Sequence, residues 1–144
     1  MFEIRVACSE DLKKIYNLET FLFKEKAWSY ASLGKEFKNS FSQIWILEKA
    51  REFLGYLIFR QILEEAEILR LGIRPEYQNQ KLGTLFLKFF LNYCKERKIK
   101  KIYLEVEELN KAAFNLYQKL GFKESYRRKN YYKERTAIIM ESKL

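Results

Sequence analysis

The sequence predicts an α/β fold with a central mixed sheet of about seven strands flanked by four helices. Short runs of branched and aromatic residues indicate strands, and longer segments repeat apolar residues at helical spacing. Between residues 67 and 107 a strand, a helix and a strand follow one another. Such a βαβ unit has parallel strands and a right-handed crossover, so the sheet must contain at least one parallel pair.

The N-terminal part of the chain is expected to contain one strand, two helices and three further strands. Ser9 offers an N-cap for the first helix, and the polar stretch A-R-E separates two strands as an antiparallel hairpin would. The expected bounds are strand 2–7, helix 11–22, helix 28–37, and strands 41–49, 53–63 and 67–74.

The C-terminal part is expected to continue as helix, strand, helix and a final hairpin. Asn110 is a plausible N-cap for the second of these helices, and Gly121 is a plausible stop at its C′ position. The expected bounds are a helix from residue 82 to about residue 96, strand 102–107, helix 110–120, and strands 122–132 and 136–142.

Length and composition favour one folded unit over residues 1–144. The chain has five glycines and a single proline, which leaves little material for linkers, and 17% of its residues are aromatic. The opening residues lack the pattern of a secretory signal, and no apolar run reaches the length of a membrane span. We therefore expect a cytoplasmic protein without a membrane partner.

The residue types exclude several kinds of chemistry. Cys8 and Cys94 are far apart and the chain contains no histidine, so neither a disulfide framework nor a metal site is expected. Without histidine, any acid-base step must be carried by carboxylates, tyrosines or lysines.

The positive charge lies in the second part of the chain. The net charge is +9, and residues 1–65 carry ten Lys/Arg against ten Asp/Glu, whereas residues 66–144 carry eighteen against nine. This distribution predicts an anionic partner for the second part, namely nucleic acid, an acidic protein surface or a polyphosphate-bearing cofactor.

The loop at residues 78–84 joins the end of a predicted strand to the start of a predicted helix. Free backbone N–H groups and the positive end of the helix dipole favour an anion at such a place. Gly83 permits close approach of a ligand, and Lys81 adds a positive charge. The plainer alternative is a tight turn at Pro75 with an unrelated glycine and a solvated lysine.

The surrounding sequence L-R-L-G-I-R-P-E-Y-Q-N-Q-K-L-G-T, at residues 69–84, resembles the central acetyl-CoA motif of the GNAT acetyltransferases. The predicted order of elements also resembles that fold. L-E-V-E-E-L-N-K-A-A-F-N-L-Y-Q-K-L-G-F at 104–122, R-R-K-N-Y-Y, A-I-I-M and A-W-S resemble the RimI type within the family. This resemblance implies an acetyl-CoA-dependent enzyme that acetylates a protein N-terminus, the alanine start of a small-subunit ribosomal protein.

The resemblance also implies which residues bind the cofactor. The two parallel motif strands splay apart, and the backbone of Leu71, Gly72 and Ile73 meets the pantetheine arm. The pyrophosphate rests on the backbone of the loop and helix start, formed by Asn79, Gln80, Lys81, Leu82, Gly83 and Thr84. Asn110 is implied to contact the cofactor as well as to cap its helix.

For catalysis, the resemblance implies Glu105 as the base and Tyr117 as the acid. Alternation alone cannot separate Glu105 from Glu107, which shares its strand face, and Glu67 is the runner-up base. Tyr117 also belongs to the apolar stripe of its helix, where a core aromatic is the usual outcome.

Substrate contacts are implied for Trp28, Tyr131 and Tyr132, although the two tyrosines could equally be ordinary cross-strand aromatics. The basic run 127–129 could be a solvated strand end, a phosphate contact or a surface for ribosomal RNA. The chain departs from the family pattern at three positions, which are Lys81 in place of a motif glycine, Ile73 in place of valine, and Thr136 in place of an acidic residue.

Other functions remain open from the sequence. A GNAT enzyme could acetylate lysine side chains or small amines instead, because a fold does not determine a substrate. A basic, non-catalytic ribosome- or RNA-binding module is a further possibility, as is a relative that binds acetyl-CoA as a sensor without turnover.

Overall fold

The computed structural model describes residues 1–132 and 135–144, except for the side chains of residues 79, 80 and 130–132. The α-helices in this part of the chain are α1 (Leu12–Phe23), α2 (Tyr30–Lys38), α3 (Leu82–Glu96) and α4 (Lys111–Lys119). Short 3-10 helices are η1 (Ser9–Asp11), η2 (Lys24–Lys26) and η3 (Pro75–Gln80). The strands are β1 (Phe2–Val6), β2 (Ser42–Lys49), β3 (Glu52–Ile62), β4 (Glu65–Ile73), β5 (Lys101–Glu107), β6 (Lys123–Tyr132) and β7 (Arg135–Lys143).

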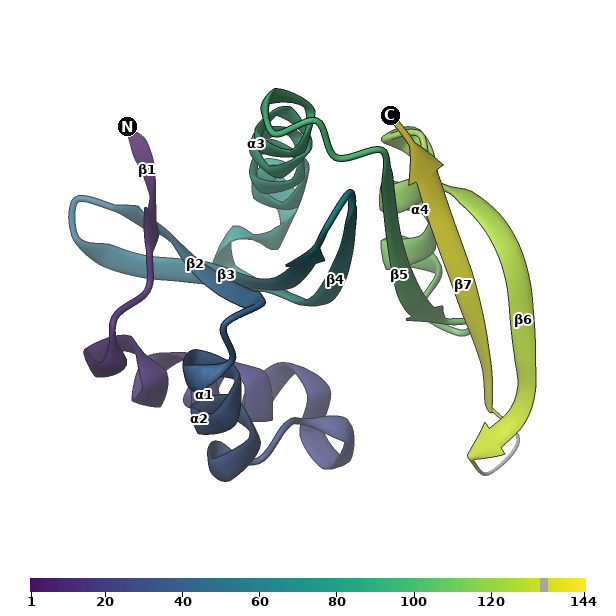
Figure 1. The fold of residues 1–144 in the computed structure, drawn as a ribbon. Helices are drawn as coiled ribbons and strands as arrows, with labels where there is room; N and C mark the ends of the chain where they lie inside the picture. The colour runs from purple at the N-terminus through teal and green to yellow at the C-terminus, as the bar shows by residue number, and fades with distance from the viewer. Residues whose placement is uncertain (133–134) are drawn as a thin grey trace.

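The strands form one sheet in the order β1-β2-β3-β4-β5-β7-β6, shown in Figure 1. Only β4 and β5 pair in parallel among these neighbours, and the crossover between them contains α3. The predicted mixed α/β fold with seven strands and four helices is therefore confirmed.

Two hydrophobic cores cover the two faces of the sheet. On one face, α1 and α2 bury Ile15 and Leu33 against Ile46, Tyr56 and Ile58 of β2 and β3. Figure 1 shows these two helices together on the same side of the sheet, opposite α3.

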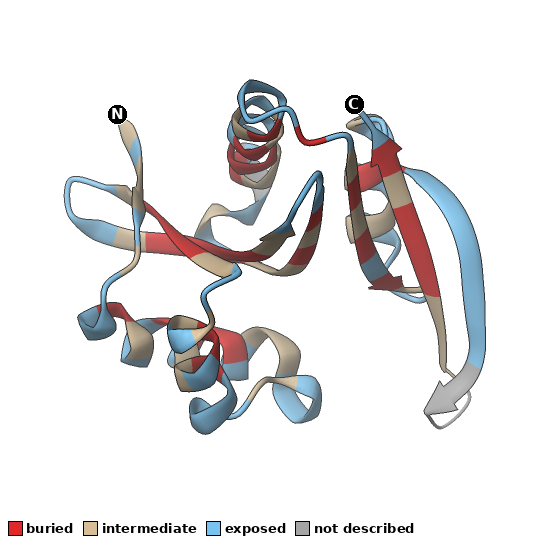
Figure 2. Cartoon of the chain, viewed as in Figure 1, coloured by how far each residue is buried: buried red, intermediate tan, exposed pale blue. Residues whose placement is uncertain are grey.

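The second core lies beneath α3 and α4. It joins Phe86 and Phe90 of α3 and Tyr117 of α4 to strand residues such as Phe59 and Leu104. Figure 2 shows that burial concentrates in the inner strands and in the inward sides of the helices, whereas β6 at the sheet edge is largely exposed.

The parallel pair β4–β5 is short. Glu65 to Ile68 pair with Lys101 to Leu104, and the pairing ends there although both strands continue. The register of β4 against β3 also shifts at this point, because Ile68 lies opposite Phe59 while Arg70 lies opposite Ile58. The extra residue, Leu69, is a β-bulge, which bends a strand and changes its direction. The predicted splaying of the motif strands is thus observed.

Most element bounds agree with the expectation, with two informative differences. Helix α2 begins at Tyr30 because the hydroxyl of Ser29 accepts a hydrogen bond from the backbone N of Ser32, a cap that the sequence analysis did not use. Residues 75–80, which lie in the connection expected between the strand and the helix, form a 3-10 helix. The predicted cap of Asn110 is confirmed by its bond from Ala113 N, and Gly121 has a positive φ of 98°.

No helix in residues 1–132 and 135–144 is long and apolar enough to cross a membrane. Nor do the described residues contain a group of three or more Cys, Asp or Glu side chains close enough to hold a metal ion.

Candidate active site

A cleft of about 780 Å³ opens where β4 and β5 diverge. Its walls are formed by residues 68–71 of β4, residues 104–107 of β5, part of α4, the segment after α1 and the start of β7. Because the gap follows from the end of strand pairing, its position is determined by the bulge at Leu69 and the short β4–β5 register.

Glu105 lies in this cleft on β5, beyond the last residue that pairs with β4. Its side chain is half exposed and forms an ion pair with Arg128, with 3.9 Å between Nη1 and Oε1. Glu107 lines the same cleft, but its carboxylate is engaged by Lys26 at 2.5 Å and Arg135 at 3.5 Å. The structure thus distinguishes Glu105 from Glu107 by their ion pairs, which the alternation of the sequence could not do.

Glu67 points to the same face of the sheet but does not line the cleft. Burial, and secondarily the negative charge of Glu105, raise the pKa of Glu67, while the nearby cations Arg60 and Arg128 act in the opposite direction. Glu67 is therefore close enough to sense Glu105 without facing the same cavity.

Tyr117 reaches the cleft from α4 and is also part of the core, so both sequence interpretations apply to it. Its ring packs edge to face against Phe122, with ring centroids 5.7 Å apart. Burial raises the pKa of Tyr117 to about 12, so the phenol keeps its proton at neutral pH. Among the described residues, its hydroxyl has no hydrogen-bond partner, which leaves it available to a bound molecule.

The backbone of Leu71, Gly72 and Ile73 pairs with β3 on one side only. Their other edge faces the gap toward β5, and Leu71 lines the cleft itself. An extended ligand arm rich in amides can pair with such an edge as another strand would. Gly72 has a further packing role, since a Cβ there would lie 2.5 Å from the Tyr56 ring.

The phosphate-loop prediction falls on η3 and the start of α3. Lys81 has φ 59° and ψ 25°, the left-handed conformation that a motif glycine adopts without strain. The first backbone N–H to bond within α3 is that of Leu85, which donates to Lys81 O. The N–H groups of Leu82, Gly83 and Thr84 come before this bond and have no partner within the helix, which is the arrangement that favours an anion.

Side chains in this loop have separate structural roles. Leu82 is buried in the core, and Gly83 allows α4 to approach, because a Cβ there would lie 3.3 Å from Leu116. Gln78 Nε2 donates to Ile73 O at 3.1 Å and ties the loop to the end of β4. The side chains of Asn79 and Gln80 lie outside the described part.

The three predicted substrate contacts are placed less directly. Trp28 packs against the core under α1 and α2 and does not line the cleft, although Phe23, Glu25 and Lys26 just before it do. The side chains of Tyr131 and Tyr132 fall outside the described residues. Asn110 lines the cleft, so its capping bond and a cofactor contact are compatible.

The family comparison explains this combination of fold and cleft. A family model described as "Acetyltransferase (GNAT) family" matches residues 9–122, most of the chain. The chain belongs to the GNAT acetyltransferase family.

Its GNAT relatives include proteins with a defined activity. The chain is 32% identical over 122 residues to the "[Ribosomal protein bS18]-alanine N-acetyltransferase" of Haemophilus influenzae, covering 85% of this chain and 82% of that protein. It is 30% identical over 126 residues to the protein of the same name from Escherichia coli K12, covering 85% and 81%. The RimI-type resemblance and the prediction of an N-acetyltransferase are thereby confirmed.

Solved GNAT structures agree with the fold. The crystal structure of the ribosomal-protein-S18-alanine N-acetyltransferase from Escherichia coli has a TM-score of 0.92 and 28% identity, covering 99% of this chain and 94% of that one. The PaiA N-acetyltransferase of Thermoplasma acidophilum in complex with coenzyme A has a TM-score of 0.77 at 22% identity, covering 100% and 99%. This second likeness shows the fold alone.

Several residues that shape this GNAT cleft were missed by the sequence analysis. Phe23, Lys26 and Arg135 line it and belong to none of the quoted motifs. Arg70 also lines it, and although it lies within the acetyl-CoA motif, no role was predicted for it. Glu19 behind them could have been noticed, because it places a carboxylate on the apolar face of α1.

The basic run 127–129 is partly neutralised in this GNAT chain. Arg127 donates to both carboxylate oxygens of Glu124, at 2.8 and 3.0 Å, and also lies 3.6 Å from Glu108. Arg128 faces Glu105 in the cleft. Of this run, Arg128 borders the cleft, a position that the sequence analysis did not predict.

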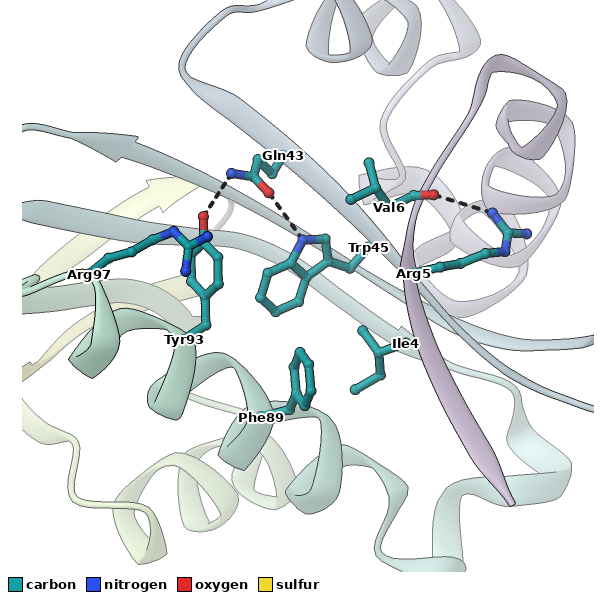
Figure 3. A pocket seen from close by; sticks show the side chains of 8 residues that line it. All are labelled: Ile4, Arg5, Val6, Gln43, Trp45, Phe89, Tyr93 and Arg97. Atoms are coloured by element: carbon teal, nitrogen blue, oxygen red, sulfur yellow. Dashed lines mark hydrogen bonds between the residues drawn. The ribbon is translucent and has the colours of Figure 1, made fainter.

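A second hollow, of about 260 Å³, lies between β1, β2 and α3 (Figure 3). There Gln43 donates to the Tyr93 hydroxyl at 2.9 Å and accepts from Trp45 Nε1 at 3.1 Å, as the dashed lines show. None of the predicted site residues lines this hollow, so we assign the candidate active site to the β4–β5 cleft.

Proposed function

We propose that this chain transfers the acetyl group of acetyl-CoA to the N-terminal amine of a protein. The leading substrate is the N-terminal alanine of a small-subunit ribosomal protein, the activity that the names of its relatives carry. The main support is that Glu105 and Tyr117 face one cleft beside the free edge of β4. The proposal includes a single domain over residues 1–144, a cytoplasmic location and no metal.

Acetyl-CoA supplies an acetyl group that is already activated as a thioester. The edge at Leu71, Gly72 and Ile73, which has no strand partner toward β5, fits its amide-containing arm, and backbone N–H groups on that edge can stabilise the developing oxyanion. The first three N–H groups of α3, with the charge of Lys81, fit its pyrophosphate. Asn110 borders the same cleft and can add a side-chain contact.

Glu105 is the proposed base. An N-terminal amine has a pKa of about 8 and arrives mostly protonated at neutral pH, so one proton must leave before attack. Glu105 can accept it directly or through one water. Glu107 is less suited to this role, because two cations already occupy its carboxylate.

Tyr117 is the proposed acid. Its phenol is protonated at neutral pH because burial raises its pKa to about 12, and its hydroxyl opens toward the cleft. The leaving thiolate can take this proton as the new amide bond forms. In the proposal, Tyr131 and Tyr132 contact the first residues of the substrate, and Trp28 supports the segment that borders it.

The substrate class is tested with a peptide panel and acetyl-CoA, read by mass spectrometry. The panel contains alanine-starting peptides, peptides with other first residues, and N-terminally blocked peptides with a free lysine. We expect a mass gain on the alanine-starting peptides. Acetylation confined to the blocked lysine peptides, or to none, would contradict the proposal.

Glu105→Gln tests the base. The amide cannot accept the proton, so we expect kcat to fall by about 100-fold or more at pH 7 with little change in peptide KM. The deficit should narrow as pH rises above about 8, where the free amine no longer needs a base. Glu67→Gln, a neighbouring carboxylate outside the cleft, is the matched control. A pH–rate profile that Glu105→Gln leaves unchanged would remove Glu105 from this role.

A further inference from the structure

Glu19 is a fully buried carboxylate that joins three separate parts of the chain. From α1 it accepts hydrogen bonds from the Tyr56 hydroxyl on β3, from Arg70 Nε on β4 at 2.9 Å, and from the backbone N of Trp28 at 3.0 Å. The bond from Trp28 lies at the C-terminal end of residues 24–28, the segment that connects α1 to α2. One helix residue therefore holds both the sheet and this connecting segment.

Arg70 extends the same contact to the rest of the segment. Its Nη2 donates to Lys26 O at 2.6 Å, while its guanidinium lies 4.0 Å from the centre of the Phe23 ring and 5.8 Å from that of Trp28. The planar guanidinium can bond a carboxylate and a carbonyl at once while it stacks on a ring. Arg70 thus contacts the last residue of α1 and two residues of the connecting segment.

The backbone of this segment contains a strained residue. Lys24 has φ 52° and ψ −119°, a positive φ that side chains other than glycine rarely adopt. Such a conformation persists only where surrounding contacts hold it. The hydrogen bond that Trp28 N donates to Glu19 and the one that Arg70 donates to Lys26 O supply those contacts on the C-terminal side of the strained residue.

The held segment forms one wall of the active-site cleft. Phe23, Glu25 and Lys26 line that cleft together with Arg70, and Arg70 immediately follows the bulge at which β4 separates from β5. Across the opening, Lys26 Nζ lies 2.5 Å from Glu107 of β5. The shape of this wall is therefore coupled to the point where the cleft opens.

A buried ion pair is poor evidence for stability, because desolvation of both charges offsets their attraction. A buried ion pair can instead select one conformation of the residues around it. Here the residues that it fixes belong to a wall of the cleft. We propose that Glu19 and Arg70 are positioning residues that hold residues 24–28 in the conformation that receives the substrate peptide. The peptide part of this inference rests on the proposed function.

The matched control is a second ion pair of the same type. Arg60 on β3 bonds Glu36 on α2, which is only 6% exposed, and neither residue lines the cleft. Arg70→Lys and Arg60→Lys each keep the positive charge and remove the guanidinium fork. Both substitutions should lower stability similarly, so a difference between them reports on the cleft wall.

The first readout needs no activity. Hydrogen exchange of the Ala27 and Trp28 amides is measured in the wild type and in both variants. In Arg70→Lys we expect exchange to accelerate by about tenfold or more, because these amides open locally once the segment loses its anchor. Arg60→Lys should leave them unchanged. Glu19→Gln provides a second variant, which retains a hydrogen-bond acceptor, if Arg70→Lys does not fold.

The second readout is kinetic. Arg70→Lys should raise the peptide KM by about tenfold while the KM for acetyl-CoA and kcat stay within about twofold, since the wall contacts the peptide and not the reacting atoms. Unchanged amide exchange together with an unchanged peptide KM would overturn the inference, as would equal effects from Arg60→Lys. If no peptide is acetylated by any form, the proposed function fails, and the exchange experiment still decides whether the pair holds the wall.

Discussion

Lys81 occupies a position where the family motif has glycine, and the backbone there is left-handed. A left-handed conformation costs a non-glycine residue about 1 to 2 kcal/mol, and the Lys81 side chain is exposed. Retention of a lysine is understandable if its charge contributes to phosphate binding at the start of α3. Replacement of Lys81 by glycine should then raise the stability of the protein and weaken its binding of the ligand.

Lys81→Gly tests this balance, with Lys98→Gly as its control. Lys98 has a φ of 60° at an exposed position after α3, away from the loop. Each substitution should raise the free energy of unfolding by about 1 kcal/mol, or the melting temperature by about 2 to 4 °C.

Only Lys81→Gly should also weaken acetyl-CoA binding and make it less sensitive to salt, because it removes a charge near the phosphates. Calorimetric titration at two salt concentrations measures this. Equal binding by both glycine variants would make Lys81 a bystander.

Helix η1 is tied to β1 through one carboxylate. Asp11 accepts two bonds from Arg5, at 2.8 and 2.9 Å, and one from the backbone N of Cys8 at 2.8 Å. The bonds from Arg5 are the main cause that lowers the pKa of Asp11 to about 2, against partial opposition from burial. A pKa lowered by folding stabilises the native state above the unfolded pKa, and this contribution is lost as pH falls through the folded pKa.

Asp11→Asn should therefore lower the free energy of unfolding by about 2 kcal/mol at pH 7. The difference from wild type should shrink to about half at pH 3 and vanish below about pH 2. Urea unfolding at these pH values measures it. Glu10→Gln, an exposed neighbour in the same 3-10 helix, should have no comparable effect, and a pH-independent loss in Asp11→Asn would exclude the linkage.

The packing of β3 against β4 requires a glycine at position 72. Tyr56 lies opposite Gly72, and a Cβ at Gly72 would come within 2.5 to 2.8 Å of three atoms of the tyrosine side chain. The same tyrosine donates its hydroxyl to Glu19. Packing, beyond any approach of a ligand, therefore requires glycine at this position.

Gly72→Ala should lower the free energy of unfolding by about 1 to 3 kcal/mol, because the added methyl must displace a buried ring. Gly34→Ala in α2 is the control, since a Cβ there meets nothing within 4 Å. That helix substitution should stabilise the protein by about 0.5 to 1 kcal/mol. Thermal melts of both variants give the comparison, and a neutral Gly72→Ala would refute the packing argument.

For the molecule as a whole, local sequence patterns predict elements better than their partners. The apolar spacing of α3 and α4 and the caps at Asn110 and Gly121 were readable because each signal lies within one element. The pairing of Glu19 with Arg70, 51 residues apart, leaves no local signal. The bulge at Leu69 is equally invisible, because it appears only in the register of two strands.

In the candidate site too, motif residues could be predicted from the sequence, whereas the side chains that surround them could not. Glu105 and Tyr117 were singled out by resemblance to the family, and the structure brings both to one cleft. The end of α1 and the segment after it were expected to act through Trp28, whereas Phe23, Glu25 and Lys26 are the residues there that line the cleft. A short A-W-S match marks the segment but does not show which of its side chains face inward.

The order of the sheet also bears on when this site can form during synthesis. The final strand, β7, lies inside the sheet and pairs with β5 along every residue from Lys101 to Glu107. On its other side, β5 has only four paired residues. Before β7 leaves the ribosome, the strand that carries Glu105 therefore lacks most of its backbone partners, so the wall that β5 forms is the last part of the cleft to be built.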